Sequence, residues 1–186
     1  MQVLSFKTGP VSVNTYIVYN PETMEGIVID PGGGYKRIKH EAAEKGITLK
    51  AQLLTHGHFD HCGASAMLQR DGLPVYIHEK DFDKPMGSGC LAESFGISFD
   101  YFTPDHKVKD GDVLNIAGLE VKVLHTPGHT SGSVCFLIED AIFSGDTLFN
   151  MSIGRTDFPD GDFEELNRSI REKLFSLEGD YDLYPG

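Results

Sequence analysis

The strongest constraint on this chain is a cluster of histidines that follows an apolar segment, in the run Leu53-Leu54-Thr55-His56-Gly57-His58-Phe59-Asp60-His61. Three of the eight histidines of the chain lie in six consecutive residues of this run, together with one aspartate. Imidazole and carboxylate groups are common ligands of zinc and other transition metals. The run therefore predicts a metal site at the end of a buried strand, rather than a polar surface loop that carries histidines by chance.

The spacing of the histidines indicates the kind of site. His56 and His58 are two residues apart, so they cannot lie on one helix face as the two histidines of a zinc-protease helix do. We expect both side chains to project from a loop. Asp60 and His61 follow so closely that turning them toward the same ion would strain this loop, and a second ion is the easier geometry. Two ions roughly 3.5 to 4 Å apart can share a hydroxide and stabilise a developing oxyanion.

Three more candidate residues follow predicted strands elsewhere in the chain. His129 lies in the run Thr-Pro-Gly-His-Thr, where proline and glycine favour a tight loop. Asp146 follows Ser-Gly, and a carboxylate with two oxygens can bridge two cations. Asp30 ends a predicted strand, and it either caps the next turn or orients a ligand imidazole.

Other reactive side chains are expected to have structural roles. His125 is predicted to be a neighbour of the site and not a ligand, and His78 is predicted to lie at the surface. Cys62 follows the last histidine of the cluster, and because adjacent side chains diverge we expect a small buried neighbour; the alternative is a thiolate ligand. The three cysteines of the chain are widely spaced and imply no disulfide framework.

Apolar alternation and turn residues predict many strands and few helices. Helices are expected over residues 35–45, 64–70 and 163–175. Segment 81–105 has no clean period, so we predict a loop or broken helix that packs over the sheet or covers a substrate. Strands are expected over residues 3–6, 11–19, 26–30, 51–54, 74–78, 113–116, 119–124, 134–138 and 141–143.

Length and charge limit the class of protein. With 186 residues the chain is long enough for one domain with a substantial core. Its formal net charge of −12 and the lack of a basic stripe argue against a nucleic-acid partner, although bound divalent ions would allow an anionic small substrate. The first ten residues hold no apolar signal segment, and the chain has no run of 18 apolar residues. We therefore expect no membrane partner and a cytoplasmic location.

Taken together, the motifs His56-x-His58-x-Asp60-His61, Thr-Pro-Gly-His129-Thr and Ser-Gly-Asp146-Thr resemble those of the metallo-β-lactamase-fold hydrolases. Asp30-Pro31-Gly32 and Gly154-Arg155-Thr156-Asp157 resemble the glyoxalase II-like (hydroxyacylglutathione hydrolase-like) branch of that superfamily. The resemblance extends from about residue 10 to the last residue. It implies an α/β (α+β) fold, a four-layer αβ/βα sandwich of two mixed β-sheets flanked by helices, as a single domain over residues 1–186.

The resemblance also implies a ligand set and a reaction. A first metal ion would be held by His56, His58 and His129, and a second by Asp60 and His61, with Asp146 bridging the two. Zinc is the expected metal, with iron or manganese possible for the same donors. The implied activity is that of a thioesterase that cleaves hydroxyacylglutathione-type thioesters with a metal-bound hydroxide. Asp60 is the candidate catalytic residue that orients this hydroxide.

One departure from the family pattern bears on the second metal. Family members carry a histidine a residue or so after the Tyr-Pro-Gly turn, whereas this chain ends at Tyr184-Pro185-Gly186. We therefore expect a chain truncated after Gly186, without the helices that carry basic residues for the glutathione carboxylates in full-length glyoxalase II. On that basis the second ion is predicted to bind more weakly than the first.

Two alternative functions are compatible with the same residues. A sulfur dioxygenase that oxidises glutathione persulfide would hold a single iron with His56, His129 and Asp146. The other alternative is a catalytically impaired metal-binding domain that lacks the last ligand.

Three residues near the predicted site are candidates for substrate binding. They are Arg155, Phe149 and Phe158. The guanidinium of Arg155 either binds a substrate carboxylate or pairs with Asp157 in its own loop, and the second role is favoured because loops with Arg-x-Asp often close on themselves.

Overall fold

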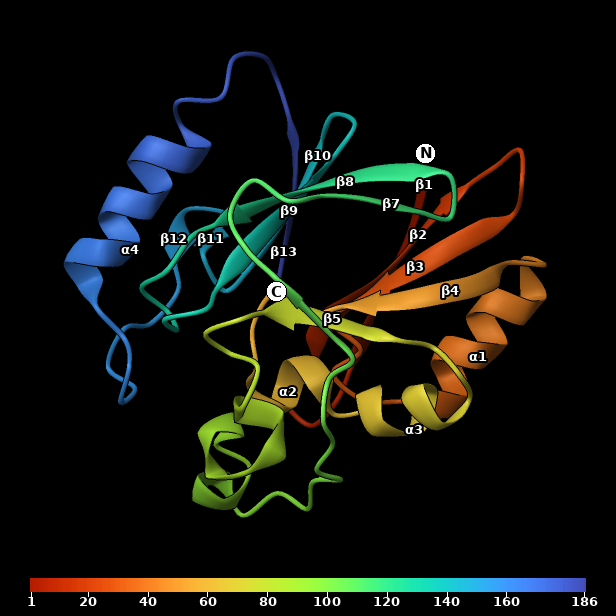
Figure 1. Cartoon of the computed structure of the whole chain (residues 1–186), viewed down its shortest axis with the longest axis horizontal. Helices are drawn as coiled ribbons and strands as arrows, with labels where there is room; N and C mark the ends of the chain where they lie inside the picture. Colours follow the sequence, from red (N-terminus) through yellow and green to blue (C-terminus); the bar gives the residue numbers. More distant parts are fainter.

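The computed structural model describes all 186 residues, and they fold into two mixed β-sheets packed face to face with helices on both outer faces (Figure 1). The first sheet has three antiparallel strands followed by three that continue in parallel. Its strands, in spatial order, are β1 (Gln2–Thr8), β2 (Val13–Asn20), β3 (Glu25–Ile29), β4 (Thr48–Leu53), β5 (Val75–His78) and β6 (His106–Val108).

The second sheet is antiparallel except for the last strand of the chain, which joins it in parallel beside β10 (Ala141–Gly145). Its strands, in spatial order, are β13 (Asp182–Pro185), β10, β9 (Val134–Ile138), β8 (Leu119–His125) and β7 (Val113–Ile116). A small ribbon of β11 (Leu148–Phe149) and β12 (Ser152–Ile153) follows β10.

The helices lie outside the two sheets. On the side of the first sheet are α1 (Tyr35–Glu44), α2 (Phe59–Cys62) and α3 (Ser65–Arg70). Beside the second sheet, α4 (Phe163–Ser169) continues directly into the π-helix η4 (Ile170–Leu174). No helix in the structure combines the length and the apolar character needed to cross a membrane.

Side-chain alternation shows how these layers pack. Ile27 of β3 points into a cluster of 16 buried residues between the two sheets, whereas Val28 packs with Ile38 of α1 in a second cluster on the outer face. Successive strand residues point to opposite faces, so one strand supplies both layers. On the far side of the molecule, Leu124 of β8 packs against Leu174 of η4. The predicted four-layer sandwich is therefore confirmed.

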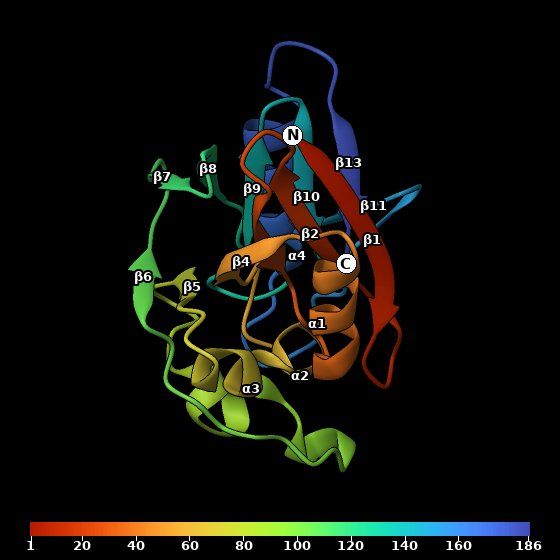
Figure 2. The same cartoon turned by 90° about the vertical axis from the view of Figure 1, so that its right-hand side faces the viewer.

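The irregular segment 81–105 lies with α2 and α3 at one end of the molecule (Figure 2). It forms three short 3-10 turns, η1 (Lys84–Met86), η2 (Ser88–Cys90) and η3 (Glu93–Phe95), in agreement with the predicted loop or broken helix. The predicted strands and helices are otherwise found within a few residues of their expected bounds.

The prediction of a surface position for His78 is wrong. Its side chain is only 3% exposed. It stacks on His125, with ring centroids 4.0 Å apart and ring planes 8° apart. His78 ends an inner strand of the first sheet and His125 ends a strand of the second. His78 is therefore buried by the packing of the two sheets.

Candidate metal centre

The candidate residues meet where four strands end. His56 and His58 follow β4, and Asp30 follows β3 in the same sheet. His129 lies in the loop between β8 and β9, and Asp146 follows β10 of the other sheet. Sites in α/β proteins lie at the carboxyl ends of strands. The packing of the two sheets therefore joins segments that are far apart in the sequence.

One group consists of His56, His58 and His129, which are all buried and offer ring nitrogens within 4.8 Å of one another. His58 Nδ1 lies 3.0 Å from His129 Nε2, and the three ring planes are nearly perpendicular, at 85° to 89°. His129 Nδ1 donates a 2.8 Å hydrogen bond to the carbonyl oxygen of Arg155, which directs Nε2 toward the group. Three imidazole nitrogens around one point can hold a divalent cation.

A second group shares His56 and adds His61 and Asp146. His61 Nε2 lies 3.2 Å from Asp146 Oδ1, and His129 Nε2 lies 3.5 Å from Asp146 Oδ2. The carboxylate thus presents one oxygen to each group, as a bridging ligand would. The end of the chain packs on it, because a Cβ added to Gly186 would lie 2.4 Å from Asp146 Oδ1.

Two buried nitrogens of these groups lack a hydrogen-bond partner, His56 Nε2 and His61 Nε2. A buried polar atom without a partner costs about 1–3 kcal/mol, so native interiors contain few of them. Both residues belong to the groups of candidate ligands. A cation there would satisfy them, so the donor set fits a metal centre.

Asp30 is hydrogen-bonded to His61 of the second group. Its Oδ2 accepts hydrogen bonds from His61 Nδ1 at 2.9 Å and from Thr55 Oγ1 at 2.6 Å, and its Oδ1 accepts from the Thr55 backbone N–H at 2.8 Å. Asp30 is 2% exposed and has a φ of 48°, in the left-handed region that Asp and Asn tolerate better than most residues. Of the two predicted roles, the geometry matches the orientation of an imidazole.

Burial and charge set the protonation of the cluster. Burial and neighbouring imidazoles lower the pKa of His58 to about 2, and they lower the pKa of His56 well below its ordinary value. Burial opposes the charge of Asp146, but His61 brings the pKa of Asp146 down to about 2. Burial also opposes the charge of His61, yet Asp146 and Asp30 raise its pKa well above its ordinary value. A cation in the second group would take the place of that proton.

Asp60, the candidate catalytic residue, lies at the margin of the cluster. Its Oδ2 is 4.0 Å from His61 Nε2, and it belongs to neither group. A Cβ added to Gly32 would lie 1.8 Å from the carbonyl oxygen of Asp60, so only glycine permits this close approach. Asp60 is also one of the residues that line the cavity above the two groups, and its implied role as a ligand of the second ion stays a prediction.

A cavity opens above the two groups, and half of its ten lining residues are apolar. Phe158 forms one wall, edge-on to His58 with ring centroids 5.3 Å apart. Arg155 also lines the cavity, but its guanidinium lies 4.2 Å from the centroid of Phe158 and donates two hydrogen bonds of 2.6 Å to Asp157. The favoured pairing within the loop is thus present. Phe149 is half-buried in the β11–β12 ribbon and is not a lining residue.

Some residues of the site carried no signal in the sequence. Leu91 and Phe95 of the irregular segment line the cavity wall, although that segment gave only a general expectation of packing or covering. Asp81 is fully buried between the two histidine loops, and its Oδ2 accepts a hydrogen bond from the Gly57 backbone N–H at 2.9 Å. It stands in a polar stretch, Glu-Lys-Asp, that is typical of a solvent-exposed turn.

Comparison with known proteins identifies relatives along nearly the whole chain. The probable metallo-hydrolase YqgX of Bacillus subtilis is 39% identical over 177 residues, which cover 91% of this chain and 82% of that protein. The hydroxyacylglutathione hydrolase GloC of Haemophilus influenzae is 38% identical over 179 residues, which cover 93% of this chain and 84% of that protein.

Solved structures agree with these relatives. The crystal structure of BLEG-1 B3 metallo-beta-lactamase matches with a TM-score of 0.92 at 34% identity, over 100% of this chain and 91% of the other. TTHA1623 in a di-iron-bound form matches with 0.85 at 33% identity, over 98% and 91%. ETHE1 from Myxococcus xanthus matches with 0.83 at 30% identity, over 100% and 75%.

One protein family matches almost the whole chain, including the candidate metal ligands. Residues 8–185 match the metallo-beta-lactamase superfamily, a range that contains both groups of histidine and aspartate. With hydrolases among its relatives, the chain belongs to the metallo-beta-lactamase superfamily of metallo-hydrolases, and its likeness to GloC and to ETHE1 is consistent with the glyoxalase II-like branch.

Proposed function

We propose that this chain is a metal-dependent thioesterase that hydrolyses hydroxyacylglutathione-type thioesters. The observation that carries the proposal is the pair of histidine and aspartate groups that share His56 beneath one cavity. The similarity to the hydroxyacylglutathione hydrolase GloC supports the choice of substrate. The net charge of −12 supports a small-molecule substrate over a nucleic acid.

The proposal assigns a first ion to His56, His58 and His129 and a second to His61 and Asp146. When bound, divalent cations supply Lewis-acid polarisation of the thioester carbonyl and an activated water. The same donors accept zinc, iron or manganese, and the likeness to a protein solved in a di-iron-bound form is a reason to test iron beside zinc.

The residues of the chain hold this site in a ready geometry. The hydrogen bonds from His129 to Arg155 and from His61 to Asp30 orient both imidazoles before a substrate arrives. Phe158 lies edge-on to the histidines, with its ring centroid 6.2 Å from that of His129, and keeps water from that side of the cavity.

Asp60 is the residue that we propose to orient the attacking water, as the carboxylate that lines the cavity beside the second group. Burial raises its pKa above the ordinary value, which makes it a better proton acceptor than an exposed aspartate. A thiolate is a good leaving group, so no separate acid is needed to protonate it.

Thiol release from S-lactoylglutathione tests the proposal. The protein loaded with Zn²⁺ or Fe²⁺ is expected to release free thiol. Asp146→Asn is expected to lose at least about 100-fold in rate, because it removes the charge of the carboxylate that presents one oxygen to each group. Metal-loaded protein that releases no thiol from this and related thioesters would refute the thioesterase and support the impaired metal-binding domain. Oxygen uptake with glutathione persulfide would instead identify the dioxygenase.

A further inference from the structure

The two loops that carry the first group of histidines are tied together by one buried carboxylate that touches none of the imidazoles. Asp81 lies just after β5 and is fully buried. Its Oδ2 accepts hydrogen bonds from the Gly57 backbone N–H at 2.9 Å and from Thr130 Oγ1 at 2.8 Å. Its Oδ1 accepts from the Gly132 backbone N–H at 2.9 Å.

These contacts join the two halves of the first group. Gly57 lies between His56 and His58, and Thr130 directly follows His129. Both halves meet the same carboxylate, so its position helps to set how far His58 Nδ1 lies from His129 Nε2, a distance of 3.0 Å.

The glycines at these contacts have no room for a side chain. A Cβ added to Gly132 would lie 2.5 Å from Asp81 Oδ1, and a Cβ added to Gly57 would lie 2.7 Å from Lys84 Cβ. Both glycines therefore bring their backbones against the segment that carries Asp81.

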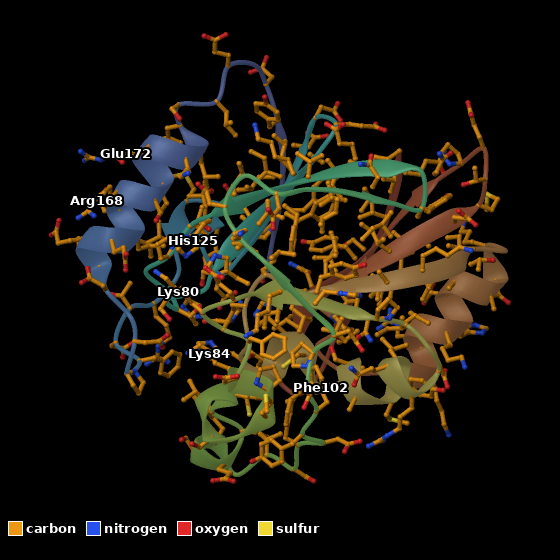
Figure 3. All side chains as sticks on the ribbon, in the orientation of Figure 1. Lys80, Lys84, Phe102, His125, Arg168 and Glu172 are labelled. Carbon is orange, nitrogen blue, oxygen red and sulfur yellow. The ribbon has the colours of Figure 1, made fainter.

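An ion pair between Lys84 and Asp160 adds to the same connection. Lys84 Nζ lies 2.8 Å from Asp160 Oδ2, and that oxygen also accepts a hydrogen bond from the Ser131 backbone N–H at 2.9 Å. Lys84 Nζ is 3.9 Å from Asp81 Oδ1, which supplies a counter-charge. Figure 3 labels Lys84 beside the irregular segment, at the end of that segment that faces the two sheets.

The chemistry of the donors explains why the residue is a carboxylate. Two backbone N–H groups and one hydroxyl converge on it, and an ionised carboxylate only accepts hydrogen bonds. An asparagine of the same shape would place an NH₂ group against one of these donors. Burying a charge is costly unless hydrogen bonds compensate, and these three donors supply that compensation.

We propose that Asp81 is a positioning residue for the metal centre, which fixes the two histidine loops at the separation that a cation needs. This inference rests on the first metal site assigned above. Asp81 acts through the backbone of Gly57 and through Thr130 and Gly132, and it does not contact the metal or the substrate.

Titration of Co²⁺ into the metal-free protein tests this role, because the visible absorption of Co²⁺ reports the geometry of its ligands apart from any activity. Asp81→Asn is expected to bind Co²⁺ about 10- to 100-fold more weakly, with an altered spectrum. Asp105→Asn is a matched control, since Asp105 also accepts from a backbone N–H, that of Val75 at 2.8 Å, and is expected to change neither readout. Ile38→Ala, in the outer core, controls for lost stability and is expected to retain the wild-type affinity.

The outcomes separate this inference from the proposed metal site. Wild-type protein that binds no Co²⁺ would refute the metal site itself. Wild type and Asp81→Asn that share one affinity and one spectrum would refute only the role of Asp81, as would an equal loss of affinity in Ile38→Ala. Should Asp81→Asn fail to fold, Thr130→Val removes the hydrogen bond to Asp81 and the one shared with Ser133 Oγ with little change in shape, and an affinity lower by about fivefold is expected. An unchanged affinity and spectrum in that variant would refute the proposal.

Discussion

The hydrogen bond between Asp30 and His61 predicts that Asp30→Asn weakens metal binding at the second site. Asparagine has nearly the same shape and also tolerates the φ of 48° at this position, so the substitution adds little backbone strain. It changes the group that faces His61 Nδ1, which is 2.9 Å from Asp30 Oδ2. With the amide oxygen kept toward the Thr55 backbone N–H, the NH₂ group faces His61.

The expected loss of metal affinity follows from replacing the carboxylate oxygen that faces His61 with an NH₂ group. An NH₂ group cannot accept the proton on His61 Nδ1, so the neutral ring is driven to carry its proton on Nε2, the nitrogen that faces Asp146. That tautomer cannot bind a cation through Nε2. Loss of an outer partner of a ligand histidine typically weakens metal binding by about 10- to 100-fold. Loss of a hydrogen bond to a charged group costs about 1.5–3 kcal/mol of folding free energy.

Titration of the metal-free protein with Co²⁺, together with denaturant unfolding, measures both effects. Affinity at the second site is expected to fall while the three-histidine site is retained. Asp71→Asn is the control, because it makes the same change at an exposed carboxylate paired with Lys39, where solvent screening leaves an ion pair with little effect on stability. Full binding of two ions by Asp30→Asn would refute the argument from the tautomer.

Three further predictions concern separate parts of the structure. His129→Ala removes a member of the first group, so metal affinity at that site is expected to fall by more than about 100-fold in a chelator competition, with the fold retained in circular dichroism. Phe136→Ala empties a fully buried position between the sheets and is expected to lower the free energy of unfolding by about 3–5 kcal/mol without loss of metal affinity. Burial and the adjacent His125 lower the pKa of His78 to about 4 from 6.5, so the unfolded chain takes up this proton first as the pH falls. Stability is therefore expected to drop between pH 6.5 and 4, by up to about 3 kcal/mol, and His78→Phe is expected to lose this part of the decline in urea unfolding curves. Equal pH slopes for the wild type and this variant would contradict the assignment.

The fold was predictable wherever strand patterns were short and clear. The run from Gly26 to Asp30 alternates between two apolar faces and ends in Asp-Pro-Gly, and it forms β3 with both faces buried. The helix over residues 35–45 has its apolar residues on one side and forms α1. Segment 81–105 was predictable only as irregular, because neither a helix nor a strand period orders its aromatic residues.

The site was predictable in composition but not in its finer geometry. The cluster from His56 to His61 and the loop of His129 identified the main donors, because tight loops after strands direct their side chains to one edge. The position of Asp60 relative to His61 was harder to predict from the sequence, because it depends on how the loop packs against Gly32. Phe149 was expected near the substrate, but its pairing with Ser152 in the ribbon holds it outside the cavity lining.

Neighbouring residues were enough to indicate which groups can bind a cation and at which strand ends they lie, because turn chemistry and hydrophobic alternation are local properties of the chain. Which of these groups meet depended on the packing of the folded protein. The stacking of His78 on His125, the hold of Asp81 on two loops and the division of Asp146 between two groups all join residues from different sheets or distant loops. Those contacts depend on how the two sheets pack across their shared core, and no local pattern along the chain records that packing.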